Sequence, residues 1–138
     1  MAAGRYSFTI EQGTTLSFEL QYKDSNGDPI DLTEYEGAMQ IRSTYSGSGD
    51  TFLTLTSSLG DSYSKSPSNS FLSFSGSNLT TPLTSGSIGI YAGFEATDAL
   101  IFGGQAFYDI ELTSGSIRTR ILEGRVQLAQ QVTSVNPV

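Results

Sequence analysis

The stretch that decides the fold is QAFYDIELTSGSIRTRILEGRVQLAQQV, residues 105–132. A tight turn at Ser114-Gly115, where glycine can supply a positive φ, folds these residues into two antiparallel strands. The facing pairs on one side of this ribbon are Leu112 with Ile117, Ile110 with Thr119 and Tyr108 with Ile121. That side is almost wholly apolar, as a strand with one buried face requires. The stretch therefore predicts a β-hairpin with one face in the core.

The opposite side of the predicted ribbon is ionic. The same register places Glu111 across from Arg118, and Asp109 across from Arg120. Opposite charges directly across two strands stabilise their pairing, whereas like charges destabilise it. One register therefore satisfies both faces, and it predicts two structural charge pairs.

The rest of the chain repeats short alternations of apolar and polar residues. The clearest covers residues 16–23, with the period of a strand that has one buried face. Single helical turns are expected over residues 31–34, which have the spacing of an N-cap, and over residues 94–100. Further strands are expected over residues 6–11, 38–43, 51–56, 71–75, 87–91 and 125–132, the last separated from the hairpin by residues 122–124. Eight or nine short strands joined by Gly, Ser, Asn and Asp are typical of an antiparallel β-sandwich or barrel.

The length of 138 residues predicts a single domain that buries roughly two-thirds of the surface of its unfolded chain. Residues 1–4 and 134–138 are expected to be short tails, and the serine-rich stretch 57–70 an exposed loop. The N-terminal residues lack the features of a signal peptide, and no apolar run approaches the ~18 residues of a membrane span. We therefore expect a soluble protein.

The absence of cysteine and histidine excludes several classes of function. Disulfide scaffolds, zinc sites built from Cys or His, thiol nucleophiles and histidine-based catalytic triads all need those residues. The net charge of −7, from 14 acidic and 7 basic residues, argues against a nucleic-acid partner. An acidic, solvated surface is the simplest explanation of the charge, and no cofactor is expected.

The turn DSNGDP contains a pattern that resembles a metal site. Asp24, Asn26 and Asp28 have the spacing of the first oxygen ligands of a calcium loop. The pattern then fails, because Pro29 stands where that loop needs glycine and Tyr35 stands where it needs glutamate. An ordinary turn explains the same residues, so no metal is predicted.

Carboxylate pairs can carry out acid–base chemistry on glycosides, and Asp109 with Glu111 is the closest such pair in the predicted register. The arginines opposite both carboxylates explain them more simply. Without histidine or cysteine, an activated nucleophile would have to be Lys23 or Lys65, and both lie in predicted loops. The chain is therefore not expected to be an enzyme.

Exposed aromatic rings can stack on sugars. Tyr45, Tyr63 and Tyr91 are the loop or edge candidates, whereas most other Phe and Tyr residues occupy inward positions of alternating runs. The sequence has no tryptophan and no aromatic cluster. A carbohydrate-binding module therefore remains an alternative role and not the preferred one.

Motifs follow one another in a definite order at both ends of the chain. The N-terminal part has Glu11-Gln12-Gly13, an alternating strand, the turn D-x-x-G-x-P-I-D-L-T over residues 24–33, and MQIR over residues 39–42. The C-terminal part has YDIEL over residues 108–112, the hairpin, and R-x-L-E-G-x-V over residues 120–126. In their order and spacing these motifs resemble a group of small virion proteins of tailed bacteriophages. The resemblance covers both ends and leaves out the serine-rich middle.

The resemblance implies an immunoglobulin-like β-sandwich used as a building block of the particle. Related proteins are collar or neck subunits, baseplate or fibre adaptors, and decoration proteins, and the family has no catalytic residues to transfer. We therefore expect a non-enzymatic structural subunit in the virion, assembled in the host cytoplasm and present as a homo-oligomer or in many copies. A tail, collar or baseplate location is preferred, with capsid decoration as the alternative.

Such a subunit would contact other tail, neck, baseplate, fibre or capsid proteins through edge strands and loops. The loops at residues 45–50 and 57–70 and the terminal strand are the candidate surfaces. The interface residues predicted there are Tyr45, Tyr63, Lys65, Arg125, Gln127 and Gln131. No membrane partner is expected.

Overall fold

The chain is a β-protein in a computed structural model that describes residues 4–43, 50–57, 65–76, 78–100 and 105–129. Within these ranges a short α-helix, α1 (Phe94–Asp98), and a 3-10 turn, η1 (Leu83–Ser85), accompany the strands. The strands are β1 (Gly4–Arg5), β2 (Phe8–Glu11), β3 (Leu16–Gln21), β4 (Glu36–Arg42), β5 (Thr51–Thr56), β6 (Ser70–Ser73), β7 (Ser87–Ala92), β8 (Gln105–Ser114) and β9 (Ile117–Ala129).

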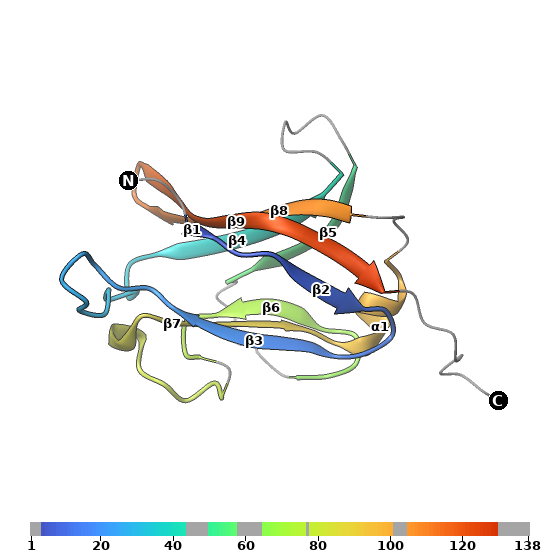
Figure 1. The fold of residues 1–138 in the computed structure, drawn as a ribbon. Helices are drawn as coiled ribbons and strands as arrows, with labels where there is room; N and C mark the ends of the chain where they lie inside the picture. The colour runs from blue at the N-terminus through green and yellow to red at the C-terminus, as the bar shows by residue number, and fades with distance from the viewer. Residues whose placement is uncertain (1–3, 44–49, 58–64, 77, 101–104, 130–138) are drawn as a thin grey trace.

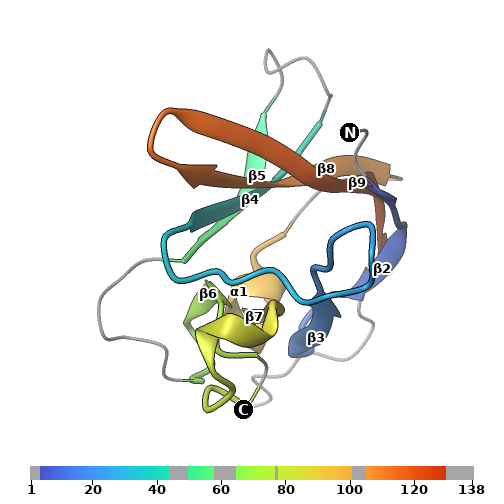
Figure 2. The same cartoon turned by 90° about the vertical axis from the view of Figure 1, so that its left-hand side faces the viewer.

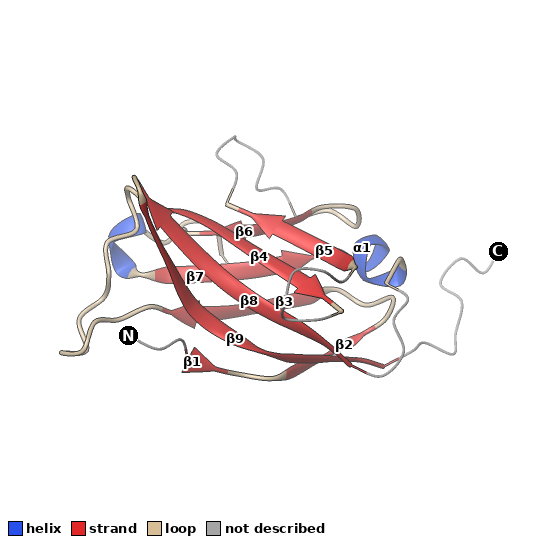
Figure 3. Cartoon of the chain, turned by 90° about the horizontal axis from the view of Figure 1, so that it is seen from above, coloured by secondary structure: helices blue, strands red, loops and turns tan. Residues whose placement is uncertain are grey.

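Two sheets pack face to face, as Figures 1 and 3 show from the side and from above. The larger sheet has the order β1-β9-β8-β4-β5, with β2 also paired to β9, and the smaller has the order β3-β7-β6. β1 and β2 run parallel to β9, and the chain then crosses to the other sheet for β3. The order β9-β8-β4-β5 in one sheet and β3-β7-β6 in the other is that of an immunoglobulin-like sandwich. The fold is therefore an all-β, immunoglobulin-like sandwich, mainly antiparallel, as the sequence predicts.

The C-terminal hairpin forms, but its register differs by two residues from the prediction. The turn occupies Gly115 and Ser116, with Gly115 at φ 60°. As a result Glu111 lies opposite Arg120, and the predicted cross-strand pair of Glu111 with Arg118 is wrong. Because a shift by two keeps each side chain on its face, the apolar residues of β8 still point into the core.

β9 continues through residues 122–124, which were predicted to break it, and extends over 13 residues. Ile121 is an extra residue between the pair Glu111–Arg120 and the pair Ile110–Leu122. Such a bulge increases the local twist and exchanges the faces of the strand beyond it. The change puts Val126 against the core and leaves its neighbours on the outer face.

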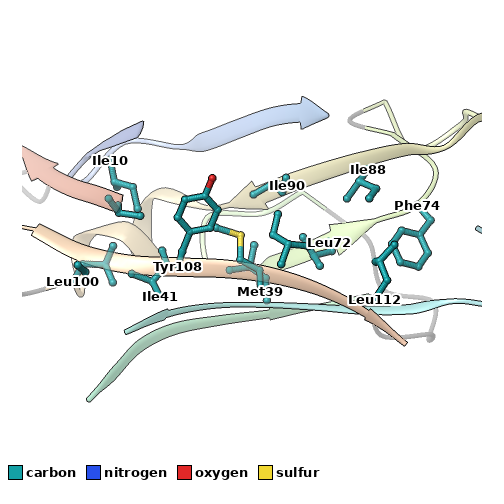
Figure 4. Close-up of a cluster of buried hydrophobic side chains, with 14 of the residues drawn as sticks. Ile10, Met39, Ile41, Leu72, Phe74, Ile88, Ile90, Leu100, Tyr108 and Leu112 are labelled. Carbon is teal, nitrogen blue, oxygen red and sulfur yellow. The ribbon is translucent and has the colours of Figure 1, made fainter. Parts of the chain in front are cut away.

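The core lies between the two sheets, and Figure 4 shows its side chains, ten of them labelled. Met39 and Ile41 of β4 point inward as predicted, each with no exposed surface. Leu72 of β6 and Ile88 of β7 belong to the same cluster and are equally buried. Both sheets therefore contribute to one continuous apolar cluster.

A contact of the backbone at Tyr6 joins the two ends of the chain. The Tyr108 hydroxyl donates a hydrogen bond of 2.6 Å to the Tyr6 carbonyl oxygen, and the Tyr6 N–H donates to the Glu123 carbonyl at 3.0 Å. Gly124 makes this approach possible, because a Cβ there would lie 1.9 Å from the Tyr6 oxygen. The predicted breaker Gly124 is thus the place where the first strands dock on the last.

Aromatic rings close the side of the sandwich next to this contact. Phe8 of β2 packs edge-on against Tyr108, with ring centroids 5.0 Å apart, and against Phe18 of β3 at 5.2 Å. Tyr6 stacks on Phe8 at 6.1 Å and stays 52% exposed. The cluster covers the gap between an edge strand of each sheet.

Residues 11–13 fasten the helix α1 to the end of β2. The Gln12 side-chain amide donates to the carbonyl oxygens of Leu100, at 2.8 Å, and Asp98, at 3.3 Å. The Gly13 N–H donates to the Thr97 hydroxyl at 3.1 Å, with Gly13 at φ 81°. The motif Glu11-Gln12-Gly13 therefore has a structural task, which is to satisfy the C-terminal carbonyls of a helix.

We expect Gln12→Ala to lower the free energy of unfolding by about 1 kcal/mol, because the Leu100 carbonyl loses a partly buried donor. Urea denaturation measures the change. Gln127→Ala is the matched control, since that side chain is exposed on β9; it should change the free energy of unfolding by less than ~0.5 kcal/mol. Equal losses in the two variants would contradict the role given to Gln12.

Residues 31–34 form a hydrogen-bonded turn and not the predicted helical turn. The Tyr35 N–H donates to the Leu32 carbonyl at 3.1 Å, and Leu32 is buried in the core. The Asp31 carboxylate accepts the hydroxyl and the N–H of Thr33, and these two bonds hold the pKa of Asp31 below its usual value. An acidic side chain that bonds two residues ahead favours such a turn.

The serine-rich stretch 57–70 is not exposed along its whole described length. Ser57 is buried, and its hydroxyl accepts the Gly37 N–H at 2.7 Å. Near the other end, the Pro67 carbonyl accepts the Glu95 N–H at 2.9 Å and lies where a Cβ on Gly93 would be. Both ends of this loop are therefore fixed by hydrogen bonds to the sandwich, whereas Lys65, Pro67 and Ser68 are exposed as predicted.

Candidate functional site

The predicted interface residues fall in different parts of the chain. Tyr45, Tyr63 and Gln131 lie outside the described residues. Lys65, Arg125 and Gln127 are described, and all three are exposed. Arg125 and Gln127 lie on the outer face of β9 in the larger sheet, whereas Lys65 precedes β6 of the smaller one. The structure thus brings two of these three together.

Arg125 and Gln127 line a shallow groove of about 380 Å³ on the outer face of the larger sheet. The Arg125 groove, as we call it, runs between β2, β8 and the second half of β9. Its lining residues are Ser7, Phe8, Thr9, Gln105, Arg125 and Gln127. Among the described residues Arg125 has no ion-pair partner, so the groove presents a guanidinium, amides and hydroxyls to a polar or acidic group.

Arg120 lies at the centre of the same face and binds three carboxylates. Its guanidinium lies 3.1 Å from Asp109, 3.7 Å from Glu111 and 3.5 Å from Glu123. The predicted charge pair of Asp109 with Arg120 is therefore present as an ion pair, although β9 places Glu123 directly opposite Asp109. Arg118, the other predicted partner, lies opposite Thr113, and its Nε is 3.4 Å from the Thr113 hydroxyl.

Asp109 has an unusual acidity within this cluster. Partial burial raises its pKa above the ordinary value, and the charge of Glu111 raises it further, while Arg120 opposes both effects. Because the pKa of Asp109 is higher in the folded than in the unfolded chain, Asp109 stabilises the fold when it is protonated. This contribution is fully present below about pH 3.8, and it is lost as the pH rises through the folded-state pKa. Arg120 therefore matters most where Asp109 is ionised.

We expect Arg120→Gln to lower the free energy of unfolding by about 1 kcal/mol at pH 7, because three nearby carboxylates lose their shared cation. The loss is no larger because the Arg120 side chain is half exposed and water screens its charge. Near pH 4 the loss should be smaller, since Asp109 is then more protonated. Urea denaturation at both pH values gives the comparison. Arg118→Gln should change stability little at either pH, and a loss from Arg120→Gln that does not depend on pH would contradict this account.

A second groove, of about 530 Å³, lies at the other end of the same face. We call it the Glu36 groove. Its lining residues are Glu36, Gly37, Ala38, Gln40, Thr56, Ser57, Glu111, Thr113 and Arg118. Its described lining residues offer hydrogen bonds and charges of both signs, and none of them has an aromatic ring on which a sugar could stack.

The structure removes Tyr91 from the candidate sugar-binding residues. Tyr91 is buried, with 8% of its surface exposed, and its hydroxyl donates to the Ser66 carbonyl at 2.9 Å. Its ring stacks on Phe71 with centroids 5.2 Å apart. Tyr91 is therefore a packing residue, and the expectation that it lies at an exposed edge is wrong.

The turn at residues 24–28 uses its oxygens internally. The Asp24 carboxylate accepts the N–H groups of Asn26, at 2.9 Å, and Asp28, at 3.0 Å, with Gly27 at φ 86°. In the part of the chain that the structure describes, no group of three His, Cys, Asp or Glu residues has a geometry that could hold a metal ion. None of the described helices has the length and apolar character needed to cross a bilayer.

The sequence matches no protein-family model, and no curated protein is significantly similar to it. Among solved structures, a marsupial T cell receptor is similar to this chain, with 11% sequence identity and a TM-score of 0.47. The similarity covers 93% of this chain and 51% of the receptor chain, so this chain spans about half the length of that one. A similarity at 11% identity says nothing about function. The fold itself is defined by the strand order and does not depend on this comparison.

Proposed function

We propose that this chain is a non-enzymatic structural subunit of a tailed-phage virion that docks neighbouring tail, collar or baseplate proteins through the edges and loops of its sandwich. The observation that carries the proposal is the ordered set of motifs at both ends of the chain. Fold alone would not suffice, because immunoglobulin-like sandwiches serve many unrelated functions.

The tasks of the motif residues in the fold support a building-block role. Gln12 binds the end of α1, and Gly124 admits the backbone of Tyr6 beneath the Tyr108 hydroxyl. Asp24 closes a turn through backbone N–H groups. Gln12, Gly124 and Asp24 therefore maintain the framework, whereas Gln40 and Glu111, which also lie in the motifs, line the Glu36 groove.

The outer face of the larger sheet offers the surface that such a subunit needs. Two shallow polar grooves flank the Arg120 cluster on it, and the exposed residues Arg125 and Gln127 lie in one of them. Polar grooves with exposed charges fit the rim of a protein–protein contact, where complementary charge selects the partner and its register. The neighbouring virion proteins are the partners in this proposal.

Deletion of the coding sequence from the phage genome tests the proposed location. We expect particles with filled heads but with an incomplete tail, collar or baseplate in electron micrographs. Complete particles of lowered physical stability would favour the alternative, a capsid decoration protein. Normal, infectious particles in normal yield would contradict the proposed role. Complementation by Arg125→Glu and by wild-type protein then shows whether the Arg125 groove contributes to docking.

A further inference from the structure

The larger sheet ends in an edge strand that is open to pairing. β5 has the sequence TFLTLT, without a charged residue or proline. It is the last strand in the order of its sheet, and among the described residues no strand pairs with its outer side. A strand of this kind is a template for the addition of another strand.

The other edges of the sandwich are protected. β1 and β2 form an edge that is interrupted at Tyr6 and carries the charged residues Arg5 and Glu11. β3 has Glu19 near its centre. β6 has only four residues and is almost wholly buried. Short length, charges and interruptions each discourage pairing with another chain. β5 has a bulge at Phe52, where its pairing with β4 shifts between Ile41 and Arg42, but residues 53–56 pair regularly and carry no charge.

The hydrogen bonds to β4 show which groups of β5 point outward. The Ser57 N–H donates to the Gly37 carbonyl at 2.9 Å, so this pair belongs to the hydrogen-bonded class of antiparallel pairs. The classes alternate along a strand, and Leu55 and Leu53 therefore bond to β4. The N–H and C=O groups of Thr54 and Thr56 must then point away from the sheet.

We propose that β5 pairs with β5 of a second copy of this chain, antiparallel, across a two-fold axis that passes through Leu55. In this register Thr54 lies opposite the partner's Thr56, and the outward backbone groups of both residues bond reciprocally. Threonines meet on the outer face, whereas Leu55 lies opposite the partner's Leu55 with its side chain buried in its own core. The larger sheets of two copies join into one continuous sheet.

The composition of the edge selects a second copy as the occupant. Two chains of net charge −7 repel one another wherever acidic groups meet. β5 brings no charge to the contact, and its sequence reads Thr-Leu-Thr in both directions about Leu55. A self-complementary patch of this kind is what a two-fold interface requires. Phe52 and Leu53, both half-buried, supply apolar surface beside the axis.

This pairing involves only the chain itself and is independent of the virion role, so either proposal can fail without the other. Sedimentation equilibrium of the whole chain, from about 1 µM to about 1 mM, should show a reversible change from the 14.7 kDa monomer to a dimer. A monomer at every concentration would overturn the proposal.

Two double variants at the same positions test the register. T54K/T56K places lysine opposite lysine twice, and it should weaken the dimer roughly tenfold or more. T54K/T56E places each lysine opposite the partner's glutamate, and it should dimerise at least as well as the unmodified chain. Both side chains are exposed, so both variants should keep the fold, which circular dichroism checks. Equal dimerisation of the two variants would overturn the proposal.

Cysteine cross-linking provides a test that does not depend on charge. The chain has no cysteine of its own, so single variants give unambiguous products. A mixture of Thr54→Cys and Thr56→Cys should form a disulfide-linked heterodimer on mild oxidation, because directly opposed Cα atoms lie about 5.5 Å apart. Each variant alone should cross-link more slowly. Faster cross-linking of either variant with itself would contradict the register.

Discussion

Gly124→Ala should lower the free energy of unfolding by about 3 kcal/mol, through a forced separation of β9 from the backbone at Tyr6. The new Cβ would lie 1.9 Å from the Tyr6 carbonyl oxygen and 3.1 Å from the Tyr108 ring. A backbone oxygen cannot swing aside as the end of a side chain does. The Tyr108 hydroxyl would therefore also lose the bond it donates at 2.6 Å.

Urea denaturation measures the loss, and amide hydrogen exchange locates it. Exchange should accelerate in β2, which depends on β9 for its pairing. Gly4→Ala is the control, because its Cβ would meet its nearest neighbour, a Leu122 side-chain carbon, at 3.4 Å. Tyr108→Phe should cost about 1 kcal/mol, the value of the hydrogen bond alone. If Gly124→Ala lowered the free energy of unfolding no more than Gly4→Ala does, the close approach of β9 to the Tyr6 backbone would be contradicted.

Leu72→Ala should lower the free energy of unfolding by about 2–5 kcal/mol. Leu72 comes from β6 of the smaller sheet, has no exposed surface and lies between the two sheets in Figure 4. Removal of its side chain leaves a cavity. A strand could fill that cavity only by moving away from the strands to which it is hydrogen-bonded. The transfer of the lost atoms and the cavity both add to the cost.

Leu83→Ala is the matched control for Leu72→Ala, since Leu83 in η1 is 37% exposed. Its loss should be below ~1 kcal/mol. Thermal and urea denaturation of both variants give the comparison. If Leu72→Ala cost no more than Leu83→Ala, the packing of β6 against the larger sheet would be contradicted.

Alternation of apolar and polar residues predicts the buried faces of the strands, because the period of two survives an error in register. Tyr108, Ile110 and Leu112 are buried for this reason, although the turn lies one residue later than predicted. The partners across the hairpin do depend on the turn. Because the turn lies elsewhere than predicted, Arg120 binds three carboxylates and not Asp109 alone.

Features that depend on contacts between distant segments could not be predicted from the sequence. Gly124 looks like a strand break, and only the approach of Tyr6 shows why glycine is needed there. Ser57 belongs to a serine-rich stretch, yet it is buried against Gly37 of β4. Ile121 bulges from β9 without a glycine or proline to mark it.

The candidate site was only partly accessible from the sequence. Arg125 and Gln127 could be chosen because they alternate with inward residues of the last strand. Both grooves escaped prediction, because their walls come from strands that are neighbours in the sheet and distant in the chain, as the view in Figure 2 of β9, β8, β4 and β5 illustrates. The order of the strands in the sheet is needed to find them, and a single sequence does not provide it.

The number of copies of this chain per purified particle is the most direct measurement of the proposed role. Quantitative mass spectrometry against the major capsid protein supplies it. We expect the same whole-number copy count in every preparation, small if the chain belongs to a ring in the tail, collar or baseplate. Absence of the chain from purified particles, or a ratio that drifts between preparations, would contradict a structural subunit of the virion.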